Sequence, residues 1–165
     1  MCHIKKTVMV AIIAMVLGCW VTVYAEDQKV DQKGKSPIKE SEIKGTGAII
    51  KVTDLKKDIK LDNSLIKPKD GFIFIGVQVI IDNTNGKTAI KSNSMYFILK
   101  DTDGTRFNSS IFKIIEPHLV ASDIDAGDKI KGWIGFEIQK NTNIDKLQIR
   151  YESFSDKSDW INITE

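Results

Sequence analysis

The sequence predicts an all-β fold, a β-sandwich of about seven to eight short strands over residues 45–165. Several segments alternate apolar and polar residues with a period of two, which is typical of half-buried strands. Clusters of Asn, Asp and Gly recur every 8 to 12 residues along this region and indicate turns. A long helical period is missing, and the best helix candidate, residues 110–115, is short and is limited by Pro117.

The strongest strand signal lies in residues 71–82, after a first predicted strand at residues 48–55. One face of this segment is wholly aliphatic and consists of Ile73, Ile75, Val77, Val79 and Ile81. The other face begins with Phe72, Phe74 and Gly76 and becomes polar from Gln78 onward. We therefore expect a central strand whose first half is covered on both faces.

The later elements follow from the same alternation. The segment from Asn83 to Gly86 predicts a tight hairpin turn, because Asn-Gly is the preferred pair for such turns. In residues 94–100, Met95 shares one face with Phe97 and Leu99. We expect Phe97, Leu99, Ile134 and Phe136 to form the side of the core that opposes the aliphatic face. Further strands are predicted at residues 88–91, 105–108, 129–138, 147–151 and 160–163.

Residues 1–25 have the layout of a secretory signal, with Lys5 and Lys6 before 19 uncharged residues. Three interpretations are open: cleavage after Ala25, lipidation of Cys19 in a lipobox-like Val-Leu-Gly-Cys sequence, or retention as a membrane-anchoring helix. Each of them makes the protein extracytoplasmic, either secreted or attached to the cell surface. Cleavage after Ala25 is favoured, because Leu17 is bulky for a lipobox and small or medium residues precede the Ala25 site.

Residues 26–44 are predicted to form a charged, flexible tether. This segment holds five acids and five lysines in 19 residues, and its three apolar residues show no useful period. Such a composition does not bury enough apolar surface to offset the entropy of ordering the chain. The sequence therefore divides into a signal or anchor at 1–25, a tether at 26–44 and one sandwich domain at 45–165.

Charge and cysteine content exclude several functional classes. The chain has 24 basic and 22 acidic residues, and removing Lys5 and Lys6 with the leader leaves 22 of each. A neutral body has no overall electrostatic footprint for nucleic acid, and we expect contact with a membrane only through the N-terminal segment. Both cysteines lie in the leader, so the body lacks a disulfide framework, a thiolate nucleophile and a cysteine-based zinc site.

Five segments resemble a known family in their order and spacing. They are FIGVQVIIDN at residues 74–83, FILKDTDG at 97–104, IDAGDKIKG at 124–132, IGFEI at 134–138 and LQIRY at 147–151. Together they resemble the DUF4352 domain of bacterial exported proteins and lipoproteins. The resemblance implies an immunoglobulin-like fold similar to that of the secreted mycobacterial antigen of the MPT63 type. It brings no catalytic residues and implies no cofactor.

Two acidic turns are candidate calcium ligands. Asp101 and Asp103 are spaced as in part of a calcium loop, but Arg106 stands where an EF-hand needs glycine. Asp123, Asp125 and Asp128 surround Gly127 in a second turn. Backbone preferences of Asp and Gly explain both turns without a metal, and we predict no metal site.

His118 and Trp133 are the other candidates for function. His118 is the one histidine outside the leader, and a serine-hydrolase elbow of the Gly-x-Ser-x-Gly type is missing. Trp133 falls on the outward parity of its predicted strand. It therefore forms a contact surface for a partner or is covered by a neighbouring loop or the C-terminal strand, and the covered state is favoured.

These observations predict an exported, non-catalytic binding or interaction module at or outside the bacterial cell surface. Its expected partner is an unidentified protein, peptide or surface polymer. A secreted proteinase inhibitor is the alternative within the binding class, with residues 108–126 as the inhibitory loop. A cell-wall hydrolase that uses His118 or the turn carboxylates is the alternative from a different class.

The leader generates the first testable prediction. If Val23-Tyr24-Ala25 is the cleavage site, mass spectrometry of the mature protein is expected to find Glu26 at the N-terminus. A diacylglyceryl mass on Cys19 would contradict this cleavage and show a lipoprotein.

Overall fold

The computed structural model describes residues 39–62 and 65–164. The described residues all belong to one compact unit. The interpretations of the leader, with Cys19 and Ala25, therefore lie outside the described residues, as does the predicted tether up to residue 38. In the described ranges, helical segments have neither the length nor the apolar content that crossing a bilayer requires.

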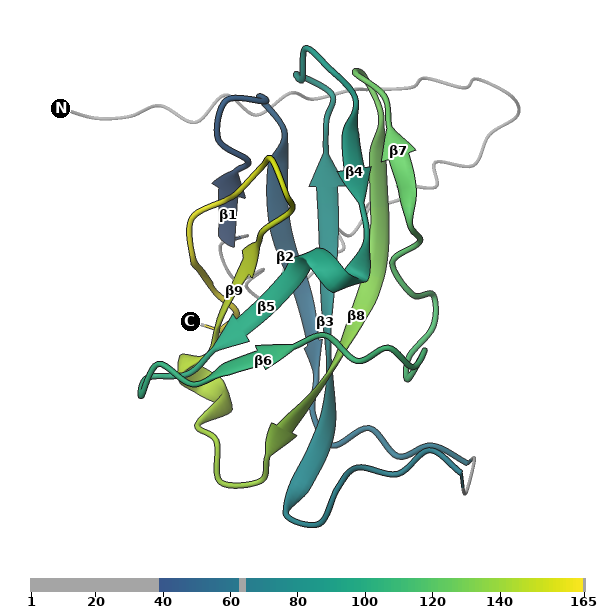
Figure 1. Cartoon of the computed structure of the whole chain (residues 1–165), viewed down its shortest axis with the longest axis vertical. Helices are drawn as coiled ribbons and strands as arrows, with labels where there is room; N and C mark the ends of the chain where they lie inside the picture. The colour runs from purple at the N-terminus through teal and green to yellow at the C-terminus, as the bar shows by residue number, and fades with distance from the viewer. Residues whose placement is uncertain (1–38, 63–64, 165) are drawn as a thin grey trace, which may run out of the picture. The chain divides into compact units, whose positions relative to one another are not determined.

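The described residues form an all-β sandwich, as predicted (Figure 1). One antiparallel sheet has the order β1 (Lys39–Glu42), β2 (Ile49–Lys56), β3 (Phe72–Asp82) and β8 (Lys129–Gln139). The second has the order β10 (Ile161–Asn162), β9 (Gln148–Tyr151), β5 (Phe97–Lys100) and β6 (Arg106–Asn108). A separate pair joins β4 (Ile90–Ser92) to β7 (Ser122–Ile124). Two 3₁₀ turns complete the elements, η1 (Ser94–Tyr96) and η2 (Ile144–Lys146).

The aliphatic face of β3 lies in the main core, as predicted. Its members from Ile75 to Ile81 are fully buried, and Phe97 and Leu99 of the second sheet belong to the same cluster. The expectation for Ile134 and Phe136 is wrong in one respect. Both are buried, but they lie beside β3 in the same sheet, where they pair with Val77 and Ile75. A side chain on a neighbouring strand shares the face rather than opposing it, and the alternation alone does not distinguish these arrangements.

The predicted hairpin after β3 is wrong, although the turn itself forms. Gly86 N donates to Asn83 O over 3.0 Å, but the chain continues into β4, which pairs with β7 instead of β3. A tight type I′ hairpin needs positive φ at both central residues, and none of Thr84, Asn85 and Gly86 adopts it. The amide of Asn83 instead donates to the carbonyls of Thr88, Ile124 and Asp125, which fixes this turn to the one before β8.

The helix candidate at residues 110–115 is also wrong, because this segment is irregular. Ser110 N donates to Gly135 O of β8 over 2.7 Å, and Ile114 and Ile115 are buried against the sheet. Tertiary contacts therefore determine the conformation of six residues that are too few to form a stable helix alone.

The domain begins earlier than Gly45, so the predicted boundary between tether and sandwich is wrong. Strand β1 pairs with β2 from Lys39 to Glu42, and the next residue, Ile43, is fully buried in the main core. Ile43 N donates to Ala48 O over 2.8 Å, and Lys44 N donates to Lys157 O over 3.0 Å. Composition indicated a tether because residues 39–44 are polar apart from Ile43. Their remaining contacts are backbone hydrogen bonds and polar contacts of Glu40, Ser41 and Lys44, which a composition does not show.

Ile43 provides a test of this boundary. Replacing Ile43 with Ala removes a fully buried side chain and is expected to lower the free energy of unfolding by about 2–5 kcal/mol. Glu42→Ala, at the exposed neighbouring position of β1, is the control and should change it by less than about 0.5 kcal/mol. Urea denaturation measures both, and equal stability of the two variants would show that β1 does not pack on the domain.

Candidate binding groove

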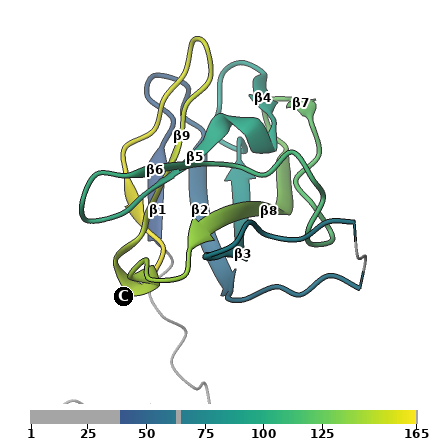
Figure 2. The ribbon, with the colours of Figure 1, turned by 60° about the horizontal axis from the view of Figure 1, so that its bottom comes forward.

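The connection from β6 to β7 wraps around the free edge of β8 (Figures 1 and 2). We call residues 109–121 the crossover segment. At its start, Ser110 N bonds Gly135 O; further along, Trp133 N donates to Pro117 O and Leu119 N donates to Trp133 O, each over 2.8 Å. These backbone hydrogen bonds cover the edge of β8 and hold the crossover segment at two places.

Two glycines make room for the first half of the crossover segment. Gly76 of β3 and Gly135 of β8 are directly paired on the outer face of the sheet. A Cβ at Gly135 would lie 2.2 Å from Ile114 Cγ1, and one at Gly76 would lie 2.9 Å from Ile115 Cδ1. The missing side chains therefore leave a trough in which Ile114 and Ile115 pack, and with Phe74 and Trp133 they form a second buried cluster.

A third glycine lets the crossover segment return to the inner face. Gly132 lies one residue before Trp133 on β8, and a Cβ there would lie 2.5 Å from Leu119 Cα. Leu119 is buried in the main core between the two sheets, whereas Ile114 belongs to the outer cluster. The segment thus passes from the outer to the inner side of one strand within a few residues.

Trp133 lies on the outer face of β8, but it is 5% exposed. The hypothesis that it forms a contact surface is therefore wrong. Its cover comes from the crossover segment and from the connection between β2 and β3, where Ile59, Leu61 and Ile66 pack against the same cluster. The C-terminal strand takes no part in this cluster.

A groove of about 180 Å³ lies between the crossover segment and the start of η1. Its polar lining includes Asn93, Ser94, Ser110 and His118. Four large apolar side chains are exposed along the crossover segment and η1, and they are Met95 (65%), Ile111 (78%), Phe112 (52%) and Val120 (50%). Ile111 and Phe112 also line the groove directly, so the hollow has an apolar rim.

Local hydrogen bonds fix the backbone around the groove. Asn93 Oδ1 accepts from Met95 N over 2.9 Å at the start of η1, and Ser110 Oγ accepts from Phe112 N over 3.1 Å. Ser92 Oγ donates to Val120 O over 2.8 Å, which ties the end of the crossover segment to β4. Both sides of the groove are therefore held in position before any ligand binds.

His118 lies in the groove beside a carboxylate. Its Nδ1 is 3.1 Å from Glu116 Oε2, and its backbone N donates to the same oxygen over 3.0 Å. The hydrogen bond with the His118 side chain, followed by that with the backbone N–H, lowers the pKa of Glu116. Among the described residues, the side-chain hydrogen bond of the His118 ring is to Glu116 and not to a serine hydroxyl.

In each acidic turn one of the candidate carboxylates is engaged, either in backbone capping or in an ion pair. Asp101 Oδ1 accepts from Asp103 N over 3.0 Å and from Thr105 N over 2.8 Å, which closes the turn between β5 and β6. Asp123 pairs with Lys91 at 2.9 Å across the β4–β7 ladder. In residues 39–62 and 65–164, groups of three His, Cys, Asp or Glu side chains that could hold a metal ion do not occur.

The sequence did not indicate the rim of this groove. Met95 was expected to share the buried face of Phe97, but it lies in η1, and the 3₁₀ geometry turns its side chain outward. Ile111 and Phe112 belonged to the wrongly predicted helix. The signal available in the sequence was that two apolar residues, Ile111 and Phe112, are adjacent. Their exposure follows from their position between Ser110, which bonds β8, and the buried Ile114, and these contacts are visible only in the structure.

The two-sheet architecture defines an immunoglobulin-like β-sandwich protein whose outermost long strand is covered by an irregular crossover. The chain belongs to the DUF4352 family, a domain of unknown function, which it matches over residues 30–160. A comparison with curated protein sequences gives no match.

Solved structures share the fold at low sequence identity. A candidate lipoprotein, YcdA of Bacillus subtilis, is 21% identical with a TM-score of 0.56 over 73% of this chain, which spans 37% of the YcdA chain. The secreted protein MPT63 of Mycobacterium tuberculosis is 12% identical with a TM-score of 0.52, over 75% of this chain and 91% of MPT63. A functionally unknown protein of Listeria monocytogenes is 12% identical with a TM-score of 0.54, over 77% of this chain and 82% of its own.

The contact between Gly135 and Ile114 can be tested by a double-mutant cycle. Gly135→Ala places a methyl group against Ile114 and is expected to destabilise the domain by about 1–3 kcal/mol. Ile114→Ala alone should cost about 2–5 kcal/mol, because it empties the trough. The double variant should be more stable than the sum of the two losses, since the new methyl group partly fills the space. Strictly additive losses in thermal denaturation would show that the two residues do not touch.

Proposed function

We propose that the protein is an exported, non-catalytic interaction module that binds a protein or peptide through the groove beside the crossover segment. The observation that carries this proposal is the exposed apolar pair Ile111 and Phe112 on the rim of the groove, with Met95 and Val120 also exposed on the segments that flank it. Exposed groups of large apolar residues next to a polar-lined hollow are typical of protein contact sites. Met and Phe are among the residues enriched in such interfaces.

The anchoring of the crossover segment supports a preformed site. Ile114, Ile115 and Leu119 are buried on either side of β8, while Ile111 and Phe112 project to solvent between Ser110 and Ile114. A ligand therefore meets side chains whose backbone is already fixed, and less entropy is lost on binding.

Export is supported by the leader and by the relatives. Residues 1–25 have the order of charges and apolar residues that a secretory signal requires. The similar solved structures include a candidate lipoprotein and a secreted protein. The module would accordingly act outside the cytoplasm, whether the leader is cleaved after Ala25, lipidated at Cys19 or retained.

The arrangement of His118 supports a role without catalysis. The ring is oriented toward Glu116 in the same turn, and the hydroxyl of Ser110 is occupied as an acceptor for Phe112 N. A cell-wall hydrolase remains the alternative from another class. It predicts that His118→Ala abolishes hydrolysis of purified cell wall, whereas the proposed module leaves cell wall intact in the wild type.

A secreted proteinase inhibitor is a second candidate, because Phe112 is exposed between anchored flanks. Such a segment could present Phe112 to the specificity pocket of a chymotrypsin-like proteinase. Inhibition that disappears in Phe112→Ala would support this candidate. Binding at the groove without inhibition would leave the interaction module as the function.

Site-specific cross-linking tests the proposed groove. A photoreactive phenylalanine analogue at position 112, introduced in the producing cells, is expected to yield a discrete adduct with an extracytoplasmic protein. The additional change Ile111→Ser should remove most of the adduct, because it deletes the neighbouring apolar contact. The same analogue at Glu42 on exposed β1 is the control. Equal adducts at both positions, or their persistence in Ile111→Ser, would contradict the proposal.

A further inference from the structure

The outer face of the second sheet gathers cations from three strands. The inward side chains of β5, β6, β9 and β10 belong to the main core, as Leu99, Phe107, Ile149 and Ile161 show. Because side chains alternate along a strand, their neighbours point outward. The outward set includes Lys100, Arg106 and Arg150, together with Gln148 and Asn162, and the ring of Trp160, just before β10, packs beside Lys100 and Arg150. In Figure 1, β5 and β6 pass in front of β2 and β3, so this outer face is turned toward the viewer.

Two of these cations are direct cross-strand partners. Lys100 pairs with Arg106 on one side and with Gln148 on the other. Like charges directly opposite each other are unfavourable. Among the described residues, neither cation has a carboxylate within ion-pair distance, and the nearby Asp101 carboxylate is engaged by the backbone of its own turn. An anion bound between Lys100 and Arg106 would relieve this repulsion.

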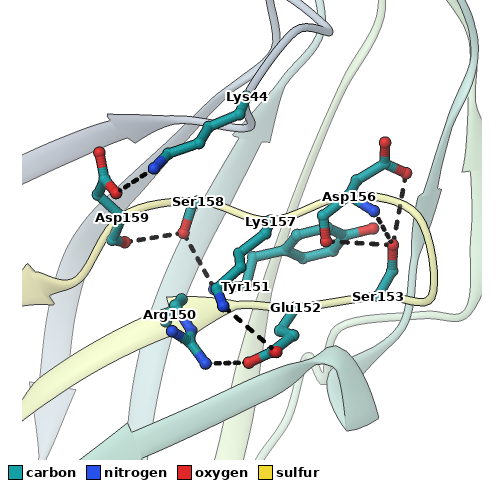
Figure 3. Close-up of polar contacts among 9 residues, drawn as sticks. All are labelled: Lys44, Arg150, Tyr151, Glu152, Ser153, Asp156, Lys157, Ser158 and Asp159. Atoms are coloured by element: carbon teal, nitrogen blue, oxygen red, sulfur yellow. Dashed lines mark hydrogen bonds and ion pairs between the residues drawn. The ribbon is translucent and has the colours of Figure 1, made fainter.

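Trp160 lies beside the cations. Lys100 Nζ is 4.3 Å from the centroid of its ring, and Arg150 Cζ is 4.4 Å from it. Arg150 is 7% exposed and pairs with Glu152, which Lys157 also approaches at 3.6 Å (Figure 3). Arg150 Nε is buried and has no hydrogen-bond partner. The Trp160 ring therefore packs on a guanidinium that is itself held in place.

The charge of Glu152 is maintained under ordinary conditions. Burial raises the pKa of this carboxyl, but the charge and hydrogen bond of Arg150, together with Lys157, outweigh burial and lower the pKa overall. Arg150 is thus neutralised internally, whereas Lys100 and Arg106 stay without a counterion on the same face. These two side chains, half-buried and exposed respectively, are the accessible part of the cluster.

We propose that this face binds an extended polymer that carries phosphate groups. Lys100 and Arg106 would receive one phosphate, since a guanidinium matches two phosphate oxygens and an ammonium adds a point charge. The chain of the polymer would continue over Trp160 toward Gln148 and Asn162, whose amides already bond each other at 2.9 Å. Four strands at about 4.8 Å spacing span roughly 14 Å, which is longer than a single phosphate and favours a repeating ligand.

This site is separate from the groove, which lies at the edge of β8 in the first sheet. The two proposals therefore stand or fall independently. A neutral net charge does not conflict with a local cationic site, because binding depends on the charges within about one Debye length, roughly 8–10 Å in ordinary salt.

Titration of the full chain with polyphosphate, followed by tryptophan fluorescence, tests the proposal. Binding is expected to change the emission, and Trp160→Phe should remove most of that change. Lys100→Gln with Arg106→Gln should weaken binding at least ~10-fold at low salt and reduce its salt dependence by about one unit of slope per cation removed. Arg106→Gln alone changes an exposed side chain and gives the same direction of effect if the double variant folds poorly.

Matched controls separate this site from general electrostatics. Lys131→Gln removes one exposed cation from β8 of the other sheet and should leave the affinity within about twofold of the wild type. Phe112→Ser, in the groove, should also leave it unchanged. Equal losses in Lys131→Gln and Arg106→Gln, or none in either, would overturn the proposal.

The source of the phosphate is decided by two further probes. Inorganic phosphate at the same total phosphate concentration should bind far more weakly than polyphosphate, because it contacts one position. Vesicles that contain phosphatidylglycerol should bind more weakly as well. Equal binding of inorganic phosphate would overturn the polymer in favour of a single-anion site, and tighter binding of the vesicles would overturn it in favour of a lipid surface.

Discussion

The pairing of β3 with β8 is the constraint on which the rest of the structure depends. This antiparallel ladder runs without interruption through eleven residue pairs, from Phe72 opposite Gln139 to Asp82 opposite Lys129. Its inner face supplies the middle of the main core, and its outer face carries a second buried cluster. Both strands are therefore fixed in register from two sides, because a shift by one residue would expose both apolar sets at once.

This register also determines where the crossover segment can lie. Gly76 and Gly135 have to be opposite each other to form the trough, and Gly132 has to face inward to admit Leu119. A displacement of either strand would place a side chain in the path of the segment. The groove rim is consequently a product of the long ladder, although Ile111 and Phe112 contact solvent rather than β3. A candidate binding surface on an irregular segment is positioned here by regular pairing beneath it.

Sequence reasoning succeeded where the determining contacts were local. The aliphatic alternation from Ile73 to Ile81 predicted β3, its inward face and its double cover, and the outward parity of Trp133 was also correct. It failed where distant residues decide the outcome. The pattern of residues 110–115 fits a short amphipathic helix as well as a segment whose isoleucines fill a glycine trough. Likewise, residues 39–42 have no apolar face, so their pairing with β2 was not visible in composition.

The cationic face shows the same limit for electrostatics. The net charge is a sum over the whole chain, whereas binding depends on which charged side chains the fold brings together. Lys100 and Arg106 are six positions apart in the sequence, and the turn at Asp101–Gly104 makes them direct neighbours across β5 and β6. Arg150 comes from β9, which is distant in the sequence, and its counterion is Glu152, two residues further along the chain. On this face the charge of Arg150 is therefore compensated by Glu152, whereas Lys100 and Arg106 have no counterion among the described residues. The face carries an excess of positive charge even though the body as a whole is neutral.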